Sequence, residues 1–179
     1  LFILMGNLMN SAGISVRIFA FAKAIVGWMR GGLCQANIVG SVIFAGMSGS
    51  AVADAAGLGT VEIEMMKKEG YDAETAGAIT AASATIGPII PPSLPMIVYG
   101  VVAETSIGAL FLAGVIPGLL LGGVQMATVH VYAKLRNYPK YPRASLSEVA
   151  KALFIAVPAL MTPVIIIGGK IFGWFTATE

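Results

Sequence analysis

The sequence predicts an all-α integral membrane protein, and its composition and its patterns of hydropathy and charge support this. Hydrophobic residues make up 57% of the 179 residues and charged residues only 11%, too little polar surface to cover a soluble globule. Charges lie in blocks between four uncharged stretches, each near or beyond the roughly 20 residues that a helix needs to cross a bilayer. The stretches are residues 31–53, 75–103, 105–133 and 152–169. A net charge of +2 without a DNA- or RNA-reading motif argues against a nucleic-acid partner.

Residues 1–31 are expected to hold the end of a transmembrane helix and then a basic helix on the membrane surface. The chain begins without a start methionine in LFILMGNLM, ends at FTATE and has no visible signal peptide, so we expect a piece of a longer protein. Cations then alternate with bulky apolar residues, as in an interfacial helix: Arg17, Lys23 and Arg30 with Phe19, Ile25, Trp28 and Met29. A plain basic loop is the alternative for this segment.

The distribution of basic residues predicts a re-entrant helical hairpin over residues 32–66. A second basic block at residues 134–151 carries five cations and one acid, Glu148. The loop expected at residues 62–74 instead has more acidic than basic residues. If every apolar run crossed the membrane, the two basic blocks would lie on opposite sides, against the positive-inside rule. A hairpin that enters from the cytoplasm and returns there places both blocks in the cytoplasm. GMSGSAVADA at residues 46–55 supplies the turn, where Asp54 is tolerated only beside water or a polar partner.

Three shorter signals have ordinary structural interpretations. Asp72 is placed to cap a helix that begins at Ala73, and Ser145 with Glu148 matches a capping box for the helix that leads into the last apolar run. The lone Cys34 lies in an apolar run, so a packing role is expected and no internal disulfide is possible.

The stretch GPIIPPSLP at residues 87–95 predicts a discontinuous helix, broken near the middle of the membrane. A helix from Ala73 has climbed roughly 20 Å by Gly87. Three prolines follow, and they remove backbone donors and clash with the preceding turn. Ser93 is placed to cap a second half-helix that runs to Glu104. The prolines with this effect are Pro88, Pro91 and Pro92.

The first arm of the hairpin extends about 24 Å into the membrane, close to the length of the helix that leads to the break. The hairpin tip and the break are therefore expected to meet and to bind ligands. Carbonyl ends of half-helices and serine hydroxyls form an oxygen shell that suits sodium. The predicted sodium ligands are Gly46, Ser48, Ser50, Gly87, Pro91 and Ser93. Free N–H groups at the starts of the half-helices suit a carboxylate. The residues predicted to contact an organic acid are Ser50, Ala51, Asp54, Pro92 and Ser93.

Packing explanations stand beside these ligand sites. A proline break in a membrane helix is often only a packing hinge. The small residues of AITAASATIG at residues 78–87 allow close helix contact, so Ser83 and Thr85 are weak candidates for binding anything. No organic cofactor is expected.

Long motifs in this chain resemble the large membrane subunit of tripartite ATP-independent periplasmic (TRAP) transporters. They are GMSGSAVADAAGLG, GYDAETAGAITAASATIGPIIPPSLPMIVYGVV and SIGALFLAGVIPGLLLG, in the family's order, and the opening LFILMGNLMNSAGI and closing GWFTATE are similar too. The resemblance implies a sodium-driven secondary transporter of the bacterial or archaeal cytoplasmic membrane, not an enzyme. Such transporters work with a smaller membrane subunit, separate or fused, and a soluble periplasmic substrate-binding protein. Family members move C4-dicarboxylates, sialic acid and related organic acids.

The resemblance also implies an elevator fold, in which a transport domain of inverted repeats carries the site past a fixed scaffold. Residues 32–133 then belong to the transport domain, as the hairpin, the broken helix at 73–104 and a helix at 106–133. Residues 1–31 and 134–179 belong to the scaffold, the latter as a cytoplasmic basic loop, an arm helix and a transmembrane helix. One inverted repeat is present, so half of the substrate site and a second sodium site would lie outside this chain, and the fragment alone is not expected to transport.

Two other functions compete with transport. Residues 46–49 match GxSG, which fits an intramembrane serine protease with Ser48 as nucleophile and His130 as base. His130 is four residues from Lys134 at the cytoplasmic end, whereas Ser48 is expected near mid-membrane, so a hydrogen bond of about 3 Å between them is not expected. A passive channel is the other alternative, because nothing in the sequence separates coupling from leakage.

Overall fold

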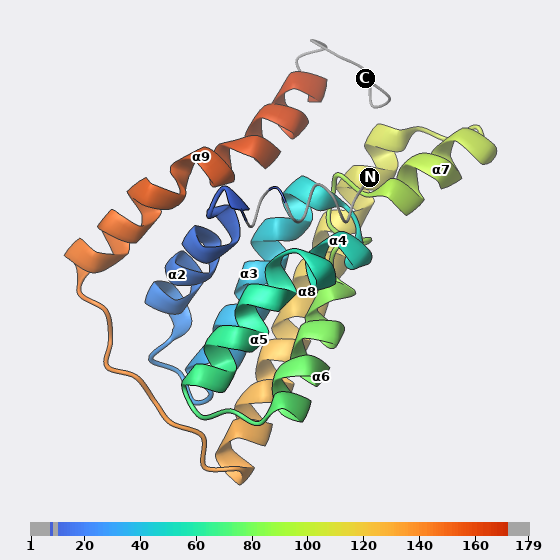
Figure 1. Ribbon diagram of the computed structural model, residues 1–179. Helices are drawn as coiled ribbons and strands as arrows, with labels where there is room; N and C mark the ends of the chain where they lie inside the picture. The colour runs from blue at the N-terminus through green and yellow to red at the C-terminus, as the bar shows by residue number, and fades with distance from the viewer. Residues whose placement is uncertain (1–7, 9–10, 172–179) are drawn as a thin grey trace.

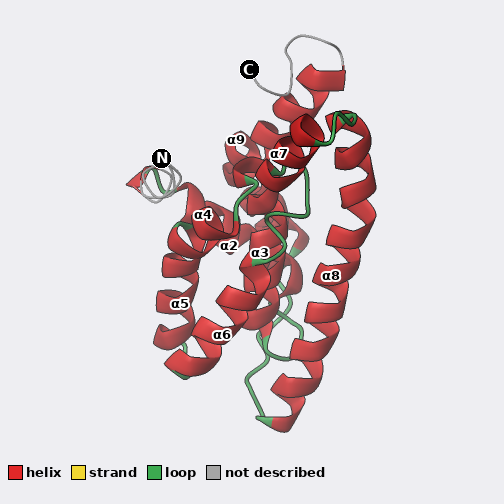
Figure 2. Ribbon diagram, turned by 90° about the vertical axis from the view of Figure 1, so that its right-hand side faces the viewer, coloured by secondary structure: helices red, strands yellow, loops and turns green. Residues whose placement is uncertain are grey.

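The computed structural model describes Leu8 and residues 11–171, and every regular element in this part is an α-helix (Figure 1). The transmembrane segment expected at the start of the chain lies largely outside the described residues, as do residues 172–179. The helices are α2 (Ile14–Val26), α3 (Gly32–Ser48), α4 (Ala51–Ala56), α5 (Leu58–Lys68), α6 (Ala73–Ala84), α7 (Leu94–Val102), α8 (Ile107–Leu135) and α9 (Leu146–Ile171). The uncharged helix α3 lies at the centre and packs against α2, α5, α6 and α8 (Figures 1 and 2).

Helices α3 and α5 are the two arms of a helical hairpin. Gly49 ends α3 with a φ of 58°, a left-handed conformation that glycine adopts at low cost. Ser50 is extended and caps α4, so the chain reverses at Gly49 and Ser50, within the predicted turn. Gly57 then separates α4 from α5, which returns along α3 (Figure 1).

The returning arm is longer than the sequence interpretation allowed. Helix α5 continues to Lys68, so the loop predicted at residues 62–74 is wrong for its first seven positions. Leu58, Glu62 and Met66 are buried along one face of α5. This spacing of four is helical, and the acidic composition of the segment concealed it.

Helices α6 and α7 are the two halves of a broken helix. Asp72 caps α6 as predicted, by accepting a hydrogen bond from the Thr75 amide. Helix α6 ends at Ala84, three residues before the expected break at Gly87, and the chain continues in turns with a cis peptide bond between Pro91 and Pro92. Ser93 caps α7, also as predicted, and α7 ends two residues before Glu104.

Helix α2, the basic helix predicted to lie on the membrane surface, packs between α3 and α9 (Figure 1). Ile18, Phe19 and Ala22 are fully buried, so this face of α2 contacts neighbouring helices. The residues at these positions recur at helical spacing and form an apolar face, which the interspersed cations obscured. Arg17 and Ile25 lie on the exposed side of α2.

Helix α9 begins with the predicted capping box and continues without interruption. The Ser145 amide donates to Glu148 Oε2 (2.7 Å), and the Glu148 amide donates to Ser145 Oγ (3.2 Å). The arm helix and last apolar run, expected as successive elements, form one helix of 26 residues.

Within the described residues, α8 is long and apolar enough to cross a membrane. Leu112, Ile116 and Leu120 lie on its exposed side. Its inner side carries glycines that admit the segment between α6 and α7: a Cβ at Gly114 would meet the Ile89 carbonyl oxygen at 2.5 Å, and one at Gly118 would meet the Ile90 side chain at 2.4 Å. The broken helix is therefore held against α8 at its break.

Candidate functional site at the hairpin tip

The hairpin tip contacts the break between α6 and α7. The Leu94 amide donates to the Gly49 carbonyl oxygen (3.3 Å). A Cβ at Gly49 would lie 2.2 Å from the Pro92 carbonyl oxygen, and one at Gly87 would lie 3.1 Å from the carbonyl carbon of Ser50. Glycine at these positions lets the two backbones approach. The predicted meeting of tip and break is confirmed.

The end of α3 leaves oxygens free at this contact. The Gly49 amide bonds back to the Ala45 carbonyl (3.1 Å) and closes the helix. The carbonyls of Gly46 and Ser48 therefore lie beyond the last helical donor, and no described residue donates to them. Ser48 Oγ is also buried without a hydrogen-bond partner.

The proline-rich segment leaves free carbonyls for a different reason. A carbonyl in a helix bonds the amide four residues later, and the residue four positions after Gly87 is Pro91, which has no amide proton. Pro95 stands four positions after Pro91 in the same way. Neither the Gly87 nor the Pro91 carbonyl accepts a hydrogen bond within the described part of the chain. Four of the six predicted sodium ligands thus carry unbonded oxygens.

The two remaining predicted ligands, Ser50 and Ser93, are engaged as helix caps. Ser50 Oγ accepts from the Ala53 amide (3.4 Å). Ser93 is fully buried, and its Oγ accepts from the Met96 amide (3.3 Å) and donates to the Pro88 carbonyl. Each hydroxyl oxygen keeps one acceptor position.

The free amides expected at the starts of both half-helices are found at one of them. At α7 the Leu94 amide bonds Gly49, Pro95 has no amide proton, and the Met96 and Ile97 amides bond Ser93. The prediction of free donors there is wrong, because the contact with the hairpin tip and the serine cap use them. At α4, by contrast, the Ala51 and Val52 amides donate to no described residue.

Asp54 lies apart from the other predicted site residues. Its side chain is 1% exposed and sits beside the Ser41 hydroxyl, about two helical turns below Ser48 on α3. Sequence reasoning missed a second buried acid, Glu62, which is fully enclosed. The helical spacing of Glu62 between Leu58 and Met66 is the signal that could have revealed it.

The geometry excludes a Ser48–His130 pair. Gln35 Nε2 on α3 donates to the Met126 carbonyl (2.9 Å), and Gly31 faces the Ala133 side chain, so His130 lies level with the start of α3. Ser48 is at the other end of α3, about 20 Å away along the helix. The GxSG match therefore has no base within reach at His130.

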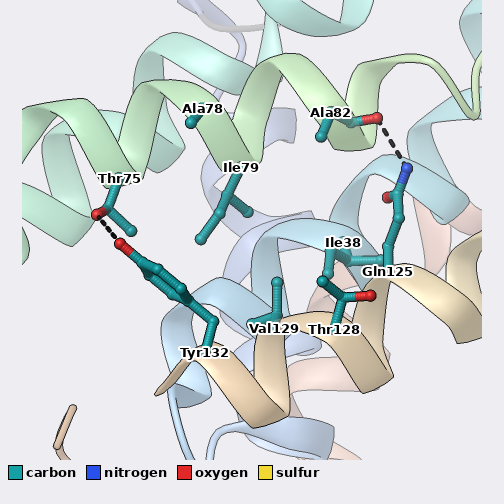
Figure 3. A pocket seen from close by; sticks show the side chains of 9 residues that line it. All are labelled: Ile38, Thr75, Ala78, Ile79, Ala82, Gln125, Thr128, Val129 and Tyr132. Carbon is teal, nitrogen blue, oxygen red and sulfur yellow. Dashed lines mark hydrogen bonds between the residues drawn. The ribbon is translucent and has the colours of Figure 1, made fainter. Parts of the chain in front are cut away.

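A pocket of about 360 Å³ lies between α3, α6 and α8, away from the tip (Figure 3). Ile38, Ile79 and Val129 form its apolar wall. At its edges Tyr132 bonds Thr75, and Gln125 Nε2 donates to the Ala82 carbonyl (2.9 Å). No residue predicted to bind sodium or substrate lines it.

The opposite end of the hairpin is joined to its surroundings by side chains. Glu69 accepts from Lys23 Nζ (3.0 Å) and from Tyr141 OH (3.1 Å), and the bond from Lys23 lowers the pKa of Glu69. Tyr138 OH donates to Asp72, which also accepts from the Thr75 amide (2.8 Å). These bonds, from Thr75 first and then Tyr138, lower the pKa of Asp72 below its usual range.

Comparison with protein families matches residues 1–179 to the DctM component of tripartite ATP-independent periplasmic transporters. The chain is 54% identical over 178 residues to the sialic acid TRAP transporter large permease protein SiaM of Vibrio cholerae. The aligned region covers 99% of the chain and 42% of that protein. It is 49% identical to the sialic acid TRAP transporter permease protein SiaT of Haemophilus influenzae, over 99% of the chain and 29% of that protein.

A relative named for a different substrate matches equally far along the chain. The C4-dicarboxylate TRAP transporter large permease protein DctM of Vibrio cholerae is 41% identical, over 99% of the chain and 39% of that protein. The chain thus spans less than half the length of each of these relatives.

Proposed function

Since the chain belongs to the DctM component family of tripartite ATP-independent periplasmic transporters, we propose that it is part of a permease that imports an organic acid by sodium symport. The permease lies in the cytoplasmic membrane of a bacterium, crosses it several times and works as an elevator. Residues 32–133 belong to the moving transport domain, as one of two inverted repeats. The rest of the repeat pair belongs to the complete protein.

The observation that carries this proposal is the junction of tip and break. Unbonded carbonyls in a low-dielectric interior cost several kcal/mol per group unless a ligand or water meets them. Here such carbonyls come from both sides of one contact, at Gly46 and Ser48 and at Gly87 and Pro91, beside an unpaired serine hydroxyl. Neutral oxygens of this kind suit a small hard cation. We assign sodium to them, with Ser50 and Ser93 completing the shell.

The substrate carboxylate is assigned to the tip side of the same junction. The open amides of Ala51 and Val52 at the start of α4, with the Ser50 hydroxyl, supply donors for an anion. Pro92 and Ser93 form the facing backbone wall. The relatives are named for sialic acid and for C4-dicarboxylates, and both compounds carry a carboxylate. A periplasmic substrate-binding protein delivers the acid, and a small membrane subunit completes the permease.

The proposed membrane topology places both basic blocks in the cytoplasm. The Lys23–Glu69 ion pair supports it, since it brings the basic helix α2 and the end of the returning hairpin arm to one end of the bundle. Tyr141 in the second basic block bonds the same carboxylate. Cysteine labelling tests this topology: Ile25→Cys and Lys68→Cys should react from the cytoplasmic side and Val102→Cys from the other. Labelling of positions 25 and 68 from opposite sides would turn the hairpin into a full crossing and overturn the topology.

Sodium coupling is tested in the complete transporter, reconstituted with its partners in proteoliposomes. Ser48→Ala removes a hydroxyl with no other partner, so we expect the sodium concentration for half-maximal uptake to rise about tenfold, equivalent to about 1.4 kcal/mol. Ser50→Ala should show the same shift together with loss of the α4 cap. Ser147→Ala on the exposed start of α9 is the matched control. An unchanged sodium response in both tip variants would remove these residues from the ion site, and uptake that never responds to sodium would favour a passive channel.

A further inference from the structure

Two carboxyl groups are buried inside the hairpin without a partner. Asp54 on α4 is 1% exposed and Glu62 on α5 is 0% exposed. None of their four carboxyl oxygens forms a hydrogen bond with any described residue. Neither group belongs to the tip junction, where the ligands are mainly backbone oxygens.

Both carboxyl groups face the same short stretch of α3. A Cβ at Gly40 would meet Glu62 Oε1 at 2.8 Å, so Glu62 reaches the α3 backbone through the space that glycine leaves. Asp54 lies beside the hydroxyl of Ser41, the next residue. The two acids are also near enough to repel each other electrostatically.

One hydroxyl group of α3 lies beside Asp54. The Ser41 hydroxyl donates to Ser83 Oγ (3.0 Å) and lies close enough to Asp54 to interact with its carboxyl group. Ser83 Oγ in turn has two acceptors for its own proton, Asn37 Oδ1 (2.7 Å) and the Thr80 carbonyl (3.1 Å). A serine oxygen carries two lone pairs, so Ser41 Oγ can add a neutral oxygen ligand to a cation bound by the carboxyl groups.

Among the side chains that the structure describes, the surrounding helices bring no positive charge to this place, and Lys151 at the start of α9 is exposed. Helix α3 has no charged residue, α4 has Asp54 alone, and α6 has the exposed Glu74. Lys67 and Lys68 on α5 and Arg17 on α2 are exposed, and Lys23 on α2 pairs with Glu69. An isolated buried carboxylate is strongly destabilising, and two that repel each other more so. The missing charge must come from a bound ion.

We propose that Asp54, Glu62 and Ser41 form a cation site inside the hairpin, separate from the tip, that holds one monovalent cation, either sodium or a proton. The cation neutralises the pair and lets α4 and α5 close on α3. Asp54 is only four residues beyond Ser50, so occupancy of this site stabilises the hairpin tip in the shape that meets the broken helix. The inference rests on the proposed transport function, but it can fail while the tip site stands.

Sodium titration of the purified complete transporter in nanodiscs tests the site, with choline chloride as the salt control. The readout is the thermal unfolding midpoint of wild type, Asp54→Asn and Glu62→Gln at several pH values. If sodium is the occupant, we expect both variants to need about tenfold more sodium for half of the stabilisation. If a proton is the occupant, the sodium response stays, and the variants lose the pH dependence of unfolding seen in wild type. Glu64→Gln, an exposed acid two residues from Glu62, is the matched control.

Wild-type protein supplies a second measurement that needs no buried substitution. An apolar carbodiimide reacts with protonated carboxyl groups in apolar surroundings, and mass spectrometry locates the modified residue. We expect modification at Asp54 or Glu62 in sodium-free buffer, blocked by sodium if sodium binds there and unaffected if a proton does. Variants that match wild type in both sodium and pH response would overturn the proposal. So would the absence of modification at both residues.

Discussion

The two ends of the hairpin and broken helix make their contacts by different means. At the tip, one backbone hydrogen bond between Leu94 and Gly49 joins the elements, and the carbonyls around it are unbonded. At the other end, side chains make the contact: Glu69 and Asp72 accept from Lys23, Tyr138 and Tyr141. The side-chain contacts satisfy their own polar groups, whereas the tip contact leaves polar groups for a ligand.

This difference separates contacts that only join helices from a contact that can also bind a ligand. Side-chain hydrogen bonds in which donor and acceptor are both paired fix the helices relative to one another and need no ligand. A contact made through glycine and proline brings two backbones together and leaves some of their carbonyl groups without amide donors. The tip end is accordingly the place where an ion or substrate adds stability, and substitutions there should differ in kind from those at the opposite end.

The largest expected effect is that of Gly49→Ala. Its φ of 58° is unfavourable for alanine, and the new Cβ would lie 2.2 Å from the Pro92 carbonyl oxygen. We expect the free energy of unfolding to fall by about 3 kcal/mol, with loss of uptake. Gly70→Ala is the matched control at the other end, because Gly70 has a φ of 89° and open space around it; strain alone should cost about 1 kcal/mol. Equal losses in denaturant unfolding of the two variants would mean that the tip contact adds nothing.

Ser93→Ala should have the next largest effect. It removes the cap of α7 and a buried hydrogen bond to the Pro88 carbonyl, which together should cost about 2 kcal/mol. Ser145→Ala removes an exposed cap and should cost about 0.5 kcal/mol. Thermal unfolding of both variants in the same nanodiscs compares them. A smaller loss for Ser93→Ala than for Ser145→Ala would contradict the account of the break.

Tyr138→Phe should weaken the other end without touching the ion response. The variant keeps the ring contact with Tyr71, whose centroid lies 4.5 Å away, but loses the bond to Asp72. We expect a loss of about 1 kcal/mol in stability and an unchanged sodium concentration for half-maximal uptake. A sodium response that shifts in this variant would show that the two ends are not separable.

The smallest effect, that of Asp72→Asn, depends on pH and is lost in acid. The pKa of Asp72 is lowered in the folded protein, so its charge contributes stability above its ordinary pKa of about 4, and this contribution is lost as pH falls toward the lower folded pKa. Asp72→Asn keeps a capping side chain but loses the charge. We expect the variant and wild type to differ near neutral pH and to converge below about pH 4. Unfolding curves that stay parallel across this range would contradict the assignment.

Local signals in the sequence were sufficient for the turns and caps. Glycine and serine at residues 46–50 predicted the hairpin turn, and Ser93, Asp72 and Ser145 predicted three helix starts, because each signal acts on its own neighbours. The family resemblance, carried by long motifs, also agreed with the comparisons.

Features that depend on packing between distant segments could not be predicted in this way. Glu62 is buried because Gly40 leaves space on α3, and the amide of Leu94 is used because Gly49 reaches it from the hairpin. Ile18 is buried in a cluster that includes Ala159 of α9, more than a hundred residues away in the sequence. Pattern and propensity describe one segment at a time and carry no information on such partners.

Hydrogen–deuterium exchange of the complete transporter, with and without sodium, tests the central claim most directly. If the tip and the break bind the ion together, sodium should slow amide exchange in residues 46–53 and 86–97 over the same concentration range. Residues 69–75 and 136–142, at the opposite end, should not change, and potassium chloride should have no effect. Protection of one tip segment without the other, or of neither, would contradict a shared sodium site at the junction.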